Sequence, residues 1–119
     1  MYSIKVEANF SSAHNLRGYK GKCEALHGHN WKIEVVVEKD KLDKTGMVLD
    51  FENLKKELHK VLEKLDHKYL NKITYFKKAN PTSENIAQYI YDNLKLPVPN
   101  LKSITVWESE NSSATYYAE

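Results

Sequence analysis

The sequence lacks several features that would assign it to a class of protein at once. It has a single cysteine, which excludes an intrachain disulfide and favours a reducing compartment. No apolar run approaches the roughly 18 residues that a membrane span needs. Lys5 and Glu7 interrupt the apolar positions where a signal peptide would have its hydrophobic region. We therefore expect a cytoplasmic protein with no membrane partner.

The sequence also has no strong excess of one charge, and no repeat, linker or low-complexity segment. Its net charge is +2 and its lysines are interspersed with glutamates, so charge alone neither requires nor excludes nucleic acid. The 119 residues, 41% hydrophobic and 29% charged, have an ordinary globular composition. This length predicts one domain over residues 1–119.

Apolar and polar residues alternate in two segments of the N-terminal half, which predicts two strands. The first strand starts at Tyr2, and its inward face of even-numbered residues continues to His14. The second strand runs over about residues 26–38. We expect an antiparallel pair in which His14 lies near His27 and His29.

Residues spaced three and four apart predict two helices after these strands. Asp50 is the expected N-cap of the first, which ends near residues 66–71, and residues 80–84 begin the second, which Pro97 and Pro99 end. The segment between the helices is expected to be a loop. Strands over residues 103–108 and 114–118, joined by a turn at Asn111 and Ser112, complete the chain. The predicted fold class is α+β, a four-stranded antiparallel sheet with two helices on one face in the order ββααββ.

Three histidines are predicted to lie together at one end of the first strand pair. His27 and His29 share the inward face of their strand with Trp31, and His14 continues the inward face of the first strand. One core histidine is usually structural, but three such imidazoles favour a metal site. Three nitrogen ligands leave a tetrahedral zinc ion one open position, as in catalytic sites, although other transition metals also accept imidazole. His59, on the first helix, is expected to face solvent.

Cys23, four residues before His27, has three interpretations. It is a fourth ligand of a structural metal site, a thiol that becomes a base because a nearby cation lowers its pKa, or a small buried hydrophobe. The polar neighbours Lys22 and Glu24 weaken the third interpretation. Spacing alone does not choose among the three.

Two other places in the sequence carry titratable residues of interest. Asp66 and His67 are adjacent where the first helix ends, and they form either a favourable helix C-terminus or a second acid–base pair. Glu108 continues the inward face of Ile104 and Val106, where an unpaired carboxylate is costly. It is either exposed by fraying of the strand or accepts two N–H bonds from an amidine-like edge such as that of a pterin.

These residues together resemble the 6-pyruvoyl-tetrahydropterin synthase superfamily of tunnelling-fold (T-fold) enzymes, over essentially the whole chain. The five matching elements, in the family's order, are Phe10–His14 with the first zinc ligand, His27-Gly28-His29 with the other two, Leu65–Asn71 with the catalytic Asp-His, Pro81–Asn85 at the second helix, and Trp107–Ser109 with the pterin-anchoring glutamate. The His-Gly-His element alone is a weak signal, whereas five elements in order are specific. The distance from Cys23 to His27 is similar to that in the bacterial 6-carboxy-tetrahydropterin synthases of queuosine biosynthesis.

The resemblance implies a zinc-dependent lyase that converts 7,8-dihydroneopterin triphosphate to 6-carboxy-tetrahydropterin, acetaldehyde and triphosphate. The implied roles are zinc ligands (His14, His27 and His29), base and proton relay (Cys23, Asp66 and His67), pterin anchor (Glu108) and further substrate contacts (Thr82, Ser83 and Glu84). The triphosphate is expected to meet basic side chains, for which the candidates are Lys20, Lys22, Lys72, Lys77 and Lys78. The sequence does not rank these five.

Two alternatives to this activity stay open. Glu24 follows Cys23 directly, and the pattern Cys-Glu-x-x-His-Gly-His resembles a subgroup that cleaves the same substrate to 6-hydroxymethyl-dihydropterin for folate biosynthesis, with the glutamate as a candidate base. The chain is compatible with either reaction or with both. The rival from another class is a non-enzymatic, zinc-stabilised module, with Cys23 as a fourth ligand and the basic loop contacting RNA.

Members of the family are commonly homohexamers, dimers of trimers in which sheets from several subunits close into a barrel. An open four-stranded sheet exposes edges that such closure protects. The resemblance implies active sites between subunits, so that Cys23 and the Asp66/His67 pair acting on one substrate come from different chains. It also implies a small-molecule partner and no nucleic acid.

Overall fold

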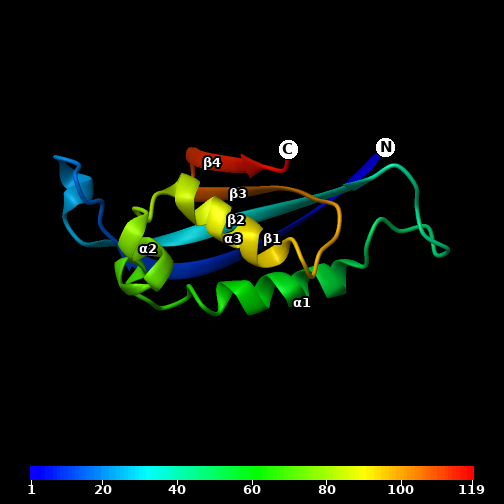
Figure 1. Cartoon of the computed structure of the whole chain (residues 1–119), viewed down its shortest axis with the longest axis horizontal. Coiled ribbons are helices and arrows are strands. Elements are labelled where there is room, and N and C mark those ends of the chain that lie inside the picture. The colour runs from blue at the N-terminus through cyan, green and yellow to red at the C-terminus, as the bar shows by residue number, and fades with distance from the viewer.

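The computed structural model describes the backbone of residues 1–119 and every side chain except that of Cys23. Its four strands are β1 (Tyr2–His14), β2 (His27–Lys39), β3 (Leu101–Ser109) and β4 (Ser112–Tyr117). They form one open sheet in the order β1-β2-β3-β4, and every neighbouring pair is antiparallel. The predicted sheet is thus confirmed. The molecule is elongated, with extents of 52 × 25 × 22 Å (Figure 1).

Two long helices, α1 (Phe51–Leu62) and α3 (Ser83–Leu94), cover the same face of the sheet, as predicted (Figure 1). The Asp50 carboxylate caps α1 by accepting a hydrogen bond from the Glu52 N–H at 2.8 Å. α1 packs against β1, and α3 packs against β3 and β4. The connection between the helices therefore crosses the end of β1 that carries His14.

The core lies between the sheet and these two helices. On β2, the side chains of Trp31, Ile33 and Val35 are fully buried, which confirms the predicted alternation. Leu54 of α1 and Ile90 of α3 are fully buried from the other side. Burial of this apolar surface is the main term that stabilises such a two-layer fold.

Four details differ from the prediction. α1 ends at Leu62, earlier than the expected end near residues 66–71, and residues 63–67 form turns instead of a further stretch of helix. The expected loop between the helices contains a 3-10 turn, η2 (Leu70–Lys72), and a short helix, α2 (Thr74–Lys78), which is too short to give a periodic pattern. The apolar spacing that predicts the first helix begins with Phe51, but this residue is 52% exposed because it is the first residue of α1. The turn between β3 and β4 lies one residue earlier than expected, at Glu110 and Asn111.

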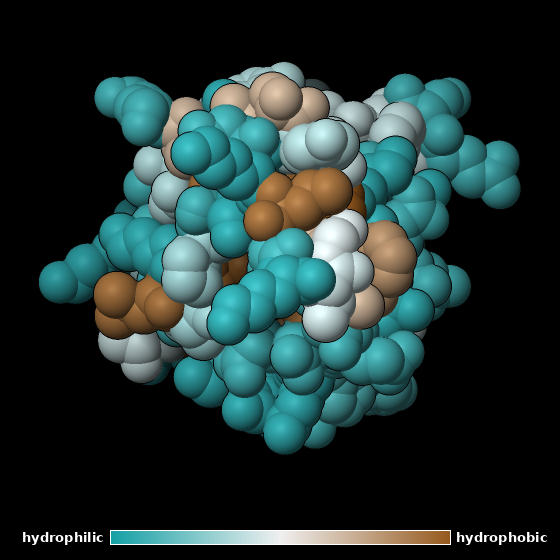
Figure 2. Space-filling view, turned by 90° about the vertical axis from the view of Figure 1, so that its right-hand side faces the viewer, coloured by the Kyte–Doolittle hydropathy of each residue, from teal (hydrophilic) through white to brown (hydrophobic). Residues whose placement is uncertain are grey.

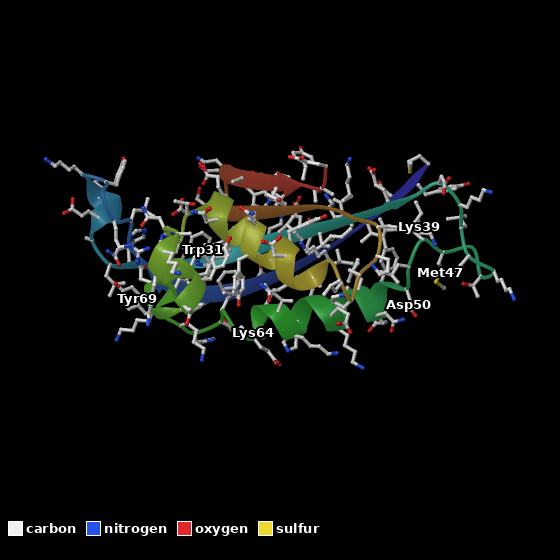
Figure 3. All side chains as sticks on the ribbon, viewed as in Figure 1. Trp31, Lys39, Met47, Asp50, Lys64 and Tyr69 are labelled. Atoms are coloured by element: carbon white, nitrogen blue, oxygen red, sulfur yellow. The ribbon has the colours of Figure 1, made fainter. Side chains whose placement is uncertain are left out.

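The two ends of the long axis differ in the residues that they carry. The loop between β1 and β2, with its 3-10 turn η1 (Lys22–Glu24), and α2 form one end (Figure 1). Lys39, Met47 and Asp50 lie toward the other end (Figure 3). That second end is mainly hydrophilic, with scattered apolar side chains (Figure 2). Within the described chain, no helix combines the length and apolar character of a membrane span.

Candidate metal centre

Three imidazoles converge where β1 and β2 pair. His14 and His27 are directly opposite each other in the ladder, and Ser12 is opposite His29. The inward faces of both strands therefore meet at this point, as the sequence predicted. The Nε2 atoms of His14 and His27 are 3.0 Å apart, and the ring of His29 lies 5.2 and 4.7 Å from the rings of His14 and His27, centroid to centroid.

Backbone carbonyls determine which nitrogen of two rings carries the proton. His14 Nδ1 is 2.7 Å from the Pro81 carbonyl oxygen, and His27 Nδ1 is 2.7 Å from the Ala25 carbonyl oxygen. A carbonyl only accepts hydrogen bonds, so both Nδ1 atoms are donors, and the tautomer that this selects carries no proton on Nε2. Two lone pairs that face each other at 3.0 Å repel unless a cation lies between them. Such outer contacts are typical of metal-bound histidines.

The third ring is held against an apolar floor. His14 and His29 both pack edge-on against Trp31, with ring centroids 4.8 and 5.0 Å away. Burial lowers the pKa of His14 and of His29 below the ordinary value of 6.5, so both rings are neutral at pH 7. The Nε2 atom of His29 is buried and has no hydrogen-bond partner of acceptable geometry among the described residues. A buried ring nitrogen without a well-aligned hydrogen-bond partner is available as a metal ligand.

Glu108 brings a carboxylate to the same place. The pairing of β3 with β4 shifts between Trp107 and Ser109, so Glu108 occupies a β-bulge, a feature that redirects a side chain. Its Oε1 atom lies 3.3 Å from His14 Nε2 and 3.1 Å from His29 Nε2. The side chain is 32% exposed, so it is only partly buried beside the imidazoles. The alternative of a frayed, fully exposed Glu108 is wrong.

This donor set fits a transition-metal ion. One ligand atom from each of the three histidines and from Glu108 lies within 4.8 Å of the others. A tetrahedral zinc ion with Zn–N bonds of about 2.0–2.1 Å places its nitrogens about 3.3 Å apart, close to the separation of His14 and His27. Imidazole with carboxylate is a donor set that zinc and several other divalent ions accept.

Asp66 and His67 lie beside β1, near the end that carries His14. The Asp66 carboxylate accepts a hydrogen bond from the Ser11 N–H at 2.9 Å, and this bond lowers the pKa of Asp66 below its usual value. The other carboxylate oxygen is 3.0 Å from His67 Nδ1, so the aspartate orients the imidazole. His67 has a left-handed backbone, with φ of 55°, and its side chain is 83% exposed. Within one chain the ring faces solvent, away from the imidazole cluster.

The other predicted site residues are less informative. The side chain of Cys23 lies outside the described residues, so its predicted role is not tested. Glu24 is exposed at the end of η1. The Thr82 hydroxyl accepts a hydrogen bond from the Asn85 N–H at 3.1 Å, which makes Thr82 the N-cap of α3. Ser83 and Glu84 follow it in the first turn, and contacts of these three residues with a substrate stay a prediction.

Sequence reasoning missed the groups that hold the centre in place. The carbonyls of Pro81 and Ala25 orient His14 and His27. Every residue has a backbone carbonyl, so residue identity does not predict these contacts. It also missed a polar network, in which the side chains of Asn71 and Asn80 bind the backbone of the loop after β1. The only signal was the number of asparagines between residues 71 and 85.

His59 faces solvent on α1, as predicted, where it pairs with Glu63 at 3.1 Å.

Comparison with known proteins identifies relatives along the full length of the chain. The family model described as 6-pyruvoyl tetrahydropterin synthase matches residues 3–119. The 6-carboxy-5,6,7,8-tetrahydropterin synthase of Synechocystis is 40% identical over 124 residues, which cover 99% of this chain and 95% of the relative. A Pyrococcus furiosus protein named dihydroneopterin monophosphate aldolase is 41% identical over 108 residues, 88% of each chain. Among solved structures, the 6-pyruvoyl tetrahydropterin synthase of Caenorhabditis elegans matches with a TM-score of 0.90 at 32% identity, over 99% of this chain and 96% of that one.

Proposed function

Because the chain belongs to the 6-pyruvoyl tetrahydropterin synthase family, we propose that it is a zinc-dependent 6-carboxy-5,6,7,8-tetrahydropterin synthase. In this proposal it converts 7,8-dihydroneopterin triphosphate to 6-carboxy-tetrahydropterin, acetaldehyde and triphosphate, as a step of queuosine biosynthesis. The observation that carries the proposal is the convergence of unprotonated imidazole nitrogens on one point. The full-length similarity to the Synechocystis enzyme supports the choice of reaction.

The proposed ligands of the zinc ion are His14, His27 and His29. A zinc ion bound there would supply Lewis acidity toward hydroxyl groups of the substrate side chain. The carbonyls of Pro81 and Ala25 keep two of the rings in the tautomer that binds a metal, so the ligands are organised before the ion arrives. The fully buried Trp31 ring packs against His14 and His29 and so supports two of these ligands.

Three other residues handle protons in this proposal. Cys23, as a thiolate, removes a proton from the carbon next to a substrate hydroxyl. His67 exchanges protons on the opposite side, and the ionised Asp66 orients its imidazole. Because His67 is 83% exposed in one chain, we propose that it serves the site of a neighbouring subunit. This requires an oligomer, which we propose to be a homohexamer of two trimers.

Glu108 is the proposed anchor of the pterin ring. A carboxylate accepts two N–H bonds from the amidine-like edge of a pterin, which would fix the ring relative to the metal ligands. The β-bulge and the partial exposure of Glu108 support this role, because the side chain is directed into the site but is not sealed within it. Without a substrate, the same carboxylate is near enough to be a fourth ligand.

A second candidate activity is the formation of 6-hydroxymethyl-dihydropterin, as used in folate biosynthesis. Glu24 favours it, because this residue offers a carboxylate base directly after Cys23. The similarity to the Pyrococcus furiosus protein, whose name describes an aldolase acting on dihydroneopterin monophosphate, also favours it. Cleavage of the side chain by an aldolase requires a base but no oxidation or reduction of the ring.

Product identification tests the proposal. The purified, zinc-loaded protein is incubated with 7,8-dihydroneopterin triphosphate, and the pterins and acetaldehyde are identified by mass spectrometry. We expect 6-carboxy-tetrahydropterin and acetaldehyde, lost in Cys23→Ala and kept in Glu24→Ala. A 6-hydroxymethyl product that is lost in Glu24→Ala would establish the second activity instead. Loss of the metal and unfolding of Cys23→Ala would indicate the structural zinc module.

A further inference from the structure

A surface cleft lies on the loop that joins the two ligand strands of the metal centre. The cleft has a volume of about 510 Å³, and Arg17, Tyr19, Lys20 and Glu24 line it together with residues 15, 16 and 18. This volume is within the range of small-molecule sites. Residue 15, which lines the cleft, follows the ligand His14 directly in the sequence.

The charge of the chain is concentrated at this end. Residues 15–26 and 66–80 carry seven basic residues and only two acidic ones, Glu24 and Asp66. The basic residues are Arg17, Lys20, Lys22, Lys68, Lys72, Lys77 and Lys78. These segments therefore contribute a net charge of +5 to a chain whose total is +2, and the remainder is net negative. A field of this sign attracts anions to the end that carries the metal centre.

Hydrogen bonds hold the start of the loop in place. The Asn71 side chain accepts from the Asn15 N–H at 3.0 Å and donates to the Asn15 carbonyl at 2.8 Å. The Asn80 side chain accepts from the Arg17 N–H at 3.1 Å and donates to the Arg17 carbonyl at 2.7 Å. These two amide side chains form the backbone hydrogen bonds that a neighbouring strand would form in a sheet. We refer to them as the asparagine clamp.

A separate hydrogen bond holds the guanidinium group of Arg17. One N–H of Arg17 donates to the Phe76 carbonyl, while the residue still lines the cleft. Arginine has five donors, so its remaining N–H groups are available to an acceptor in the cleft. A cation that is held in place before the ligand arrives loses less entropy on binding.

We propose that the cleft lined by Arg17, Tyr19 and Lys20 binds the polyphosphate group of the substrate. The guanidinium of Arg17 and the ammonium of Lys20 contact phosphate oxygens, and the Tyr19 hydroxyl donates a further hydrogen bond. This ranks Lys20 above Lys22, Lys72, Lys77 and Lys78, none of which lines the cleft. The inference relies on the proposed function for the identity of the substrate, but the cleft and its charge do not depend on it.

Binding of inorganic tripolyphosphate to the zinc-loaded protein tests the proposal, with titration calorimetry as the readout. We expect Lys20→Ala to weaken binding about tenfold, the loss of one charged phosphate contact. Lys22→Ala removes the same charge from the same loop outside the cleft, and we expect an effect below about threefold. Lys44→Ala, at the opposite end, serves as the control for net charge. Chelation of the zinc ion by tripolyphosphate contributes equally to all four proteins, so the differences report on the side chains.

Steady-state kinetics separates this inference from the proposed function. We expect Lys20→Ala to raise the KM for dihydroneopterin triphosphate about tenfold and to leave kcat within about twofold. An active enzyme whose KM is unchanged in Lys20→Ala would overturn the cleft assignment and leave the function standing. If the wild-type protein is inactive but binds tripolyphosphate, and Lys20→Ala loses that binding, the cleft assignment would stand and the proposed function would be overturned. Equal losses of tripolyphosphate affinity in Lys20→Ala and Lys22→Ala would also overturn the assignment. So would a wild-type protein that binds an RNA oligonucleotide but does not bind tripolyphosphate.

Discussion

At the scale of single residues, the candidate centre depends on proton positions as much as on side-chain identity. His14 and His27 each donate from Nδ1 to a backbone carbonyl, and so their Nε2 atoms are free to bind a cation. Replacing either ring by an amide or an acid would change both the ligand and its outer contact. The histidines therefore act as parts of a preorganised unit.

Glu108 gives a residue-scale prediction that separates a metal ligand from a pterin anchor. We expect Glu108→Gln to retain one zinc ion per chain, measured by elemental analysis, and to raise the KM for the substrate at least about tenfold, because an amide cannot accept two N–H bonds in the same way. Glu34→Gln, on the opposite face of the sheet, is the control. Loss of zinc from Glu108→Gln would show that the carboxylate is a ligand and not an anchor.

Asp66 gives a pH dependence of stability. The hydrogen bond from the Ser11 N–H lowers the pKa of Asp66, so the folded state favours the ionised form. Its contribution is present above the unfolded pKa of about 3.9 and is lost as the pH falls through the lower folded value. We expect Asp66→Asn to be less stable than wild type at pH 6 and the difference to shrink toward pH 2, measured by urea unfolding. A constant difference across this range, or the same profile for Asp40→Asn, would contradict the assignment.

Residue identities predicted part of this site. The alternation of β1 and β2 was enough to bring His14, His27 and His29 together, because strand parity and antiparallel pairing fix which side chains meet. The same rule predicted that Glu108 points inward. It could not predict the bulge that directs Glu108 at the imidazoles, because a bulge depends on the pairing with β4 and not on the residues of β3 alone.

At the scale of secondary-structure elements, the connections decide where the site residues lie. The segment after α1 runs beside β1, where the Lys68 carbonyl accepts from the Ala13 N–H at 3.0 Å and the His67 N–H donates to the Ser11 carbonyl at 2.6 Å. This contact brings Asp66 and His67 to the end of β1. The sequence predicted that the first helix ends near residues 66–71 and that a loop follows, since turns held by long-range bonds leave no periodic pattern.

The asparagine clamp is the element-scale prediction. Asn80→Ala removes two hydrogen bonds to the backbone of Arg17, whose N–H and C=O groups must then bond to water. We expect a loss of about 1–2 kcal/mol in the free energy of unfolding, measured in urea. Asn93→Ala is the matched control, because Asn93 makes one bond within α3, to the Tyr89 carbonyl. Equal losses in the two variants would show that the clamp does not stabilise the loop.

At the scale of the whole molecule, the open sheet and the exposed His67 both favour an assembly of several subunits. β1 and β4 are sheet edges with unpaired backbone groups over most of their length. His67 is a functional candidate that faces solvent in one chain. Both observations are accounted for by the proposed arrangement, in which the active sites lie between subunits.

Mixing two inactive variants tests this arrangement. Cys23→Ala and His67→Ala each remove one proposed catalytic residue, so each oligomer alone is expected to be inactive. If the two residues of one site come from different chains, random co-assembly restores about a quarter of the sites. We therefore expect activity near a quarter of wild type after the variants are unfolded together and refolded. Activity that stays at the level of the single variants would place both residues in the same chain.

The most direct test of the account is the coordination of the metal, because every proposed role depends on three imidazoles that leave one position for the substrate. X-ray absorption spectroscopy of the zinc-loaded protein measures this without any assumption about activity. We predict one zinc ion per chain with three imidazole nitrogens at about 2.0 Å, a light oxygen ligand and no sulfur. A sulfur shell at about 2.3 Å, which would make Cys23 the fourth ligand, would contradict the account, as would a protein that binds no metal.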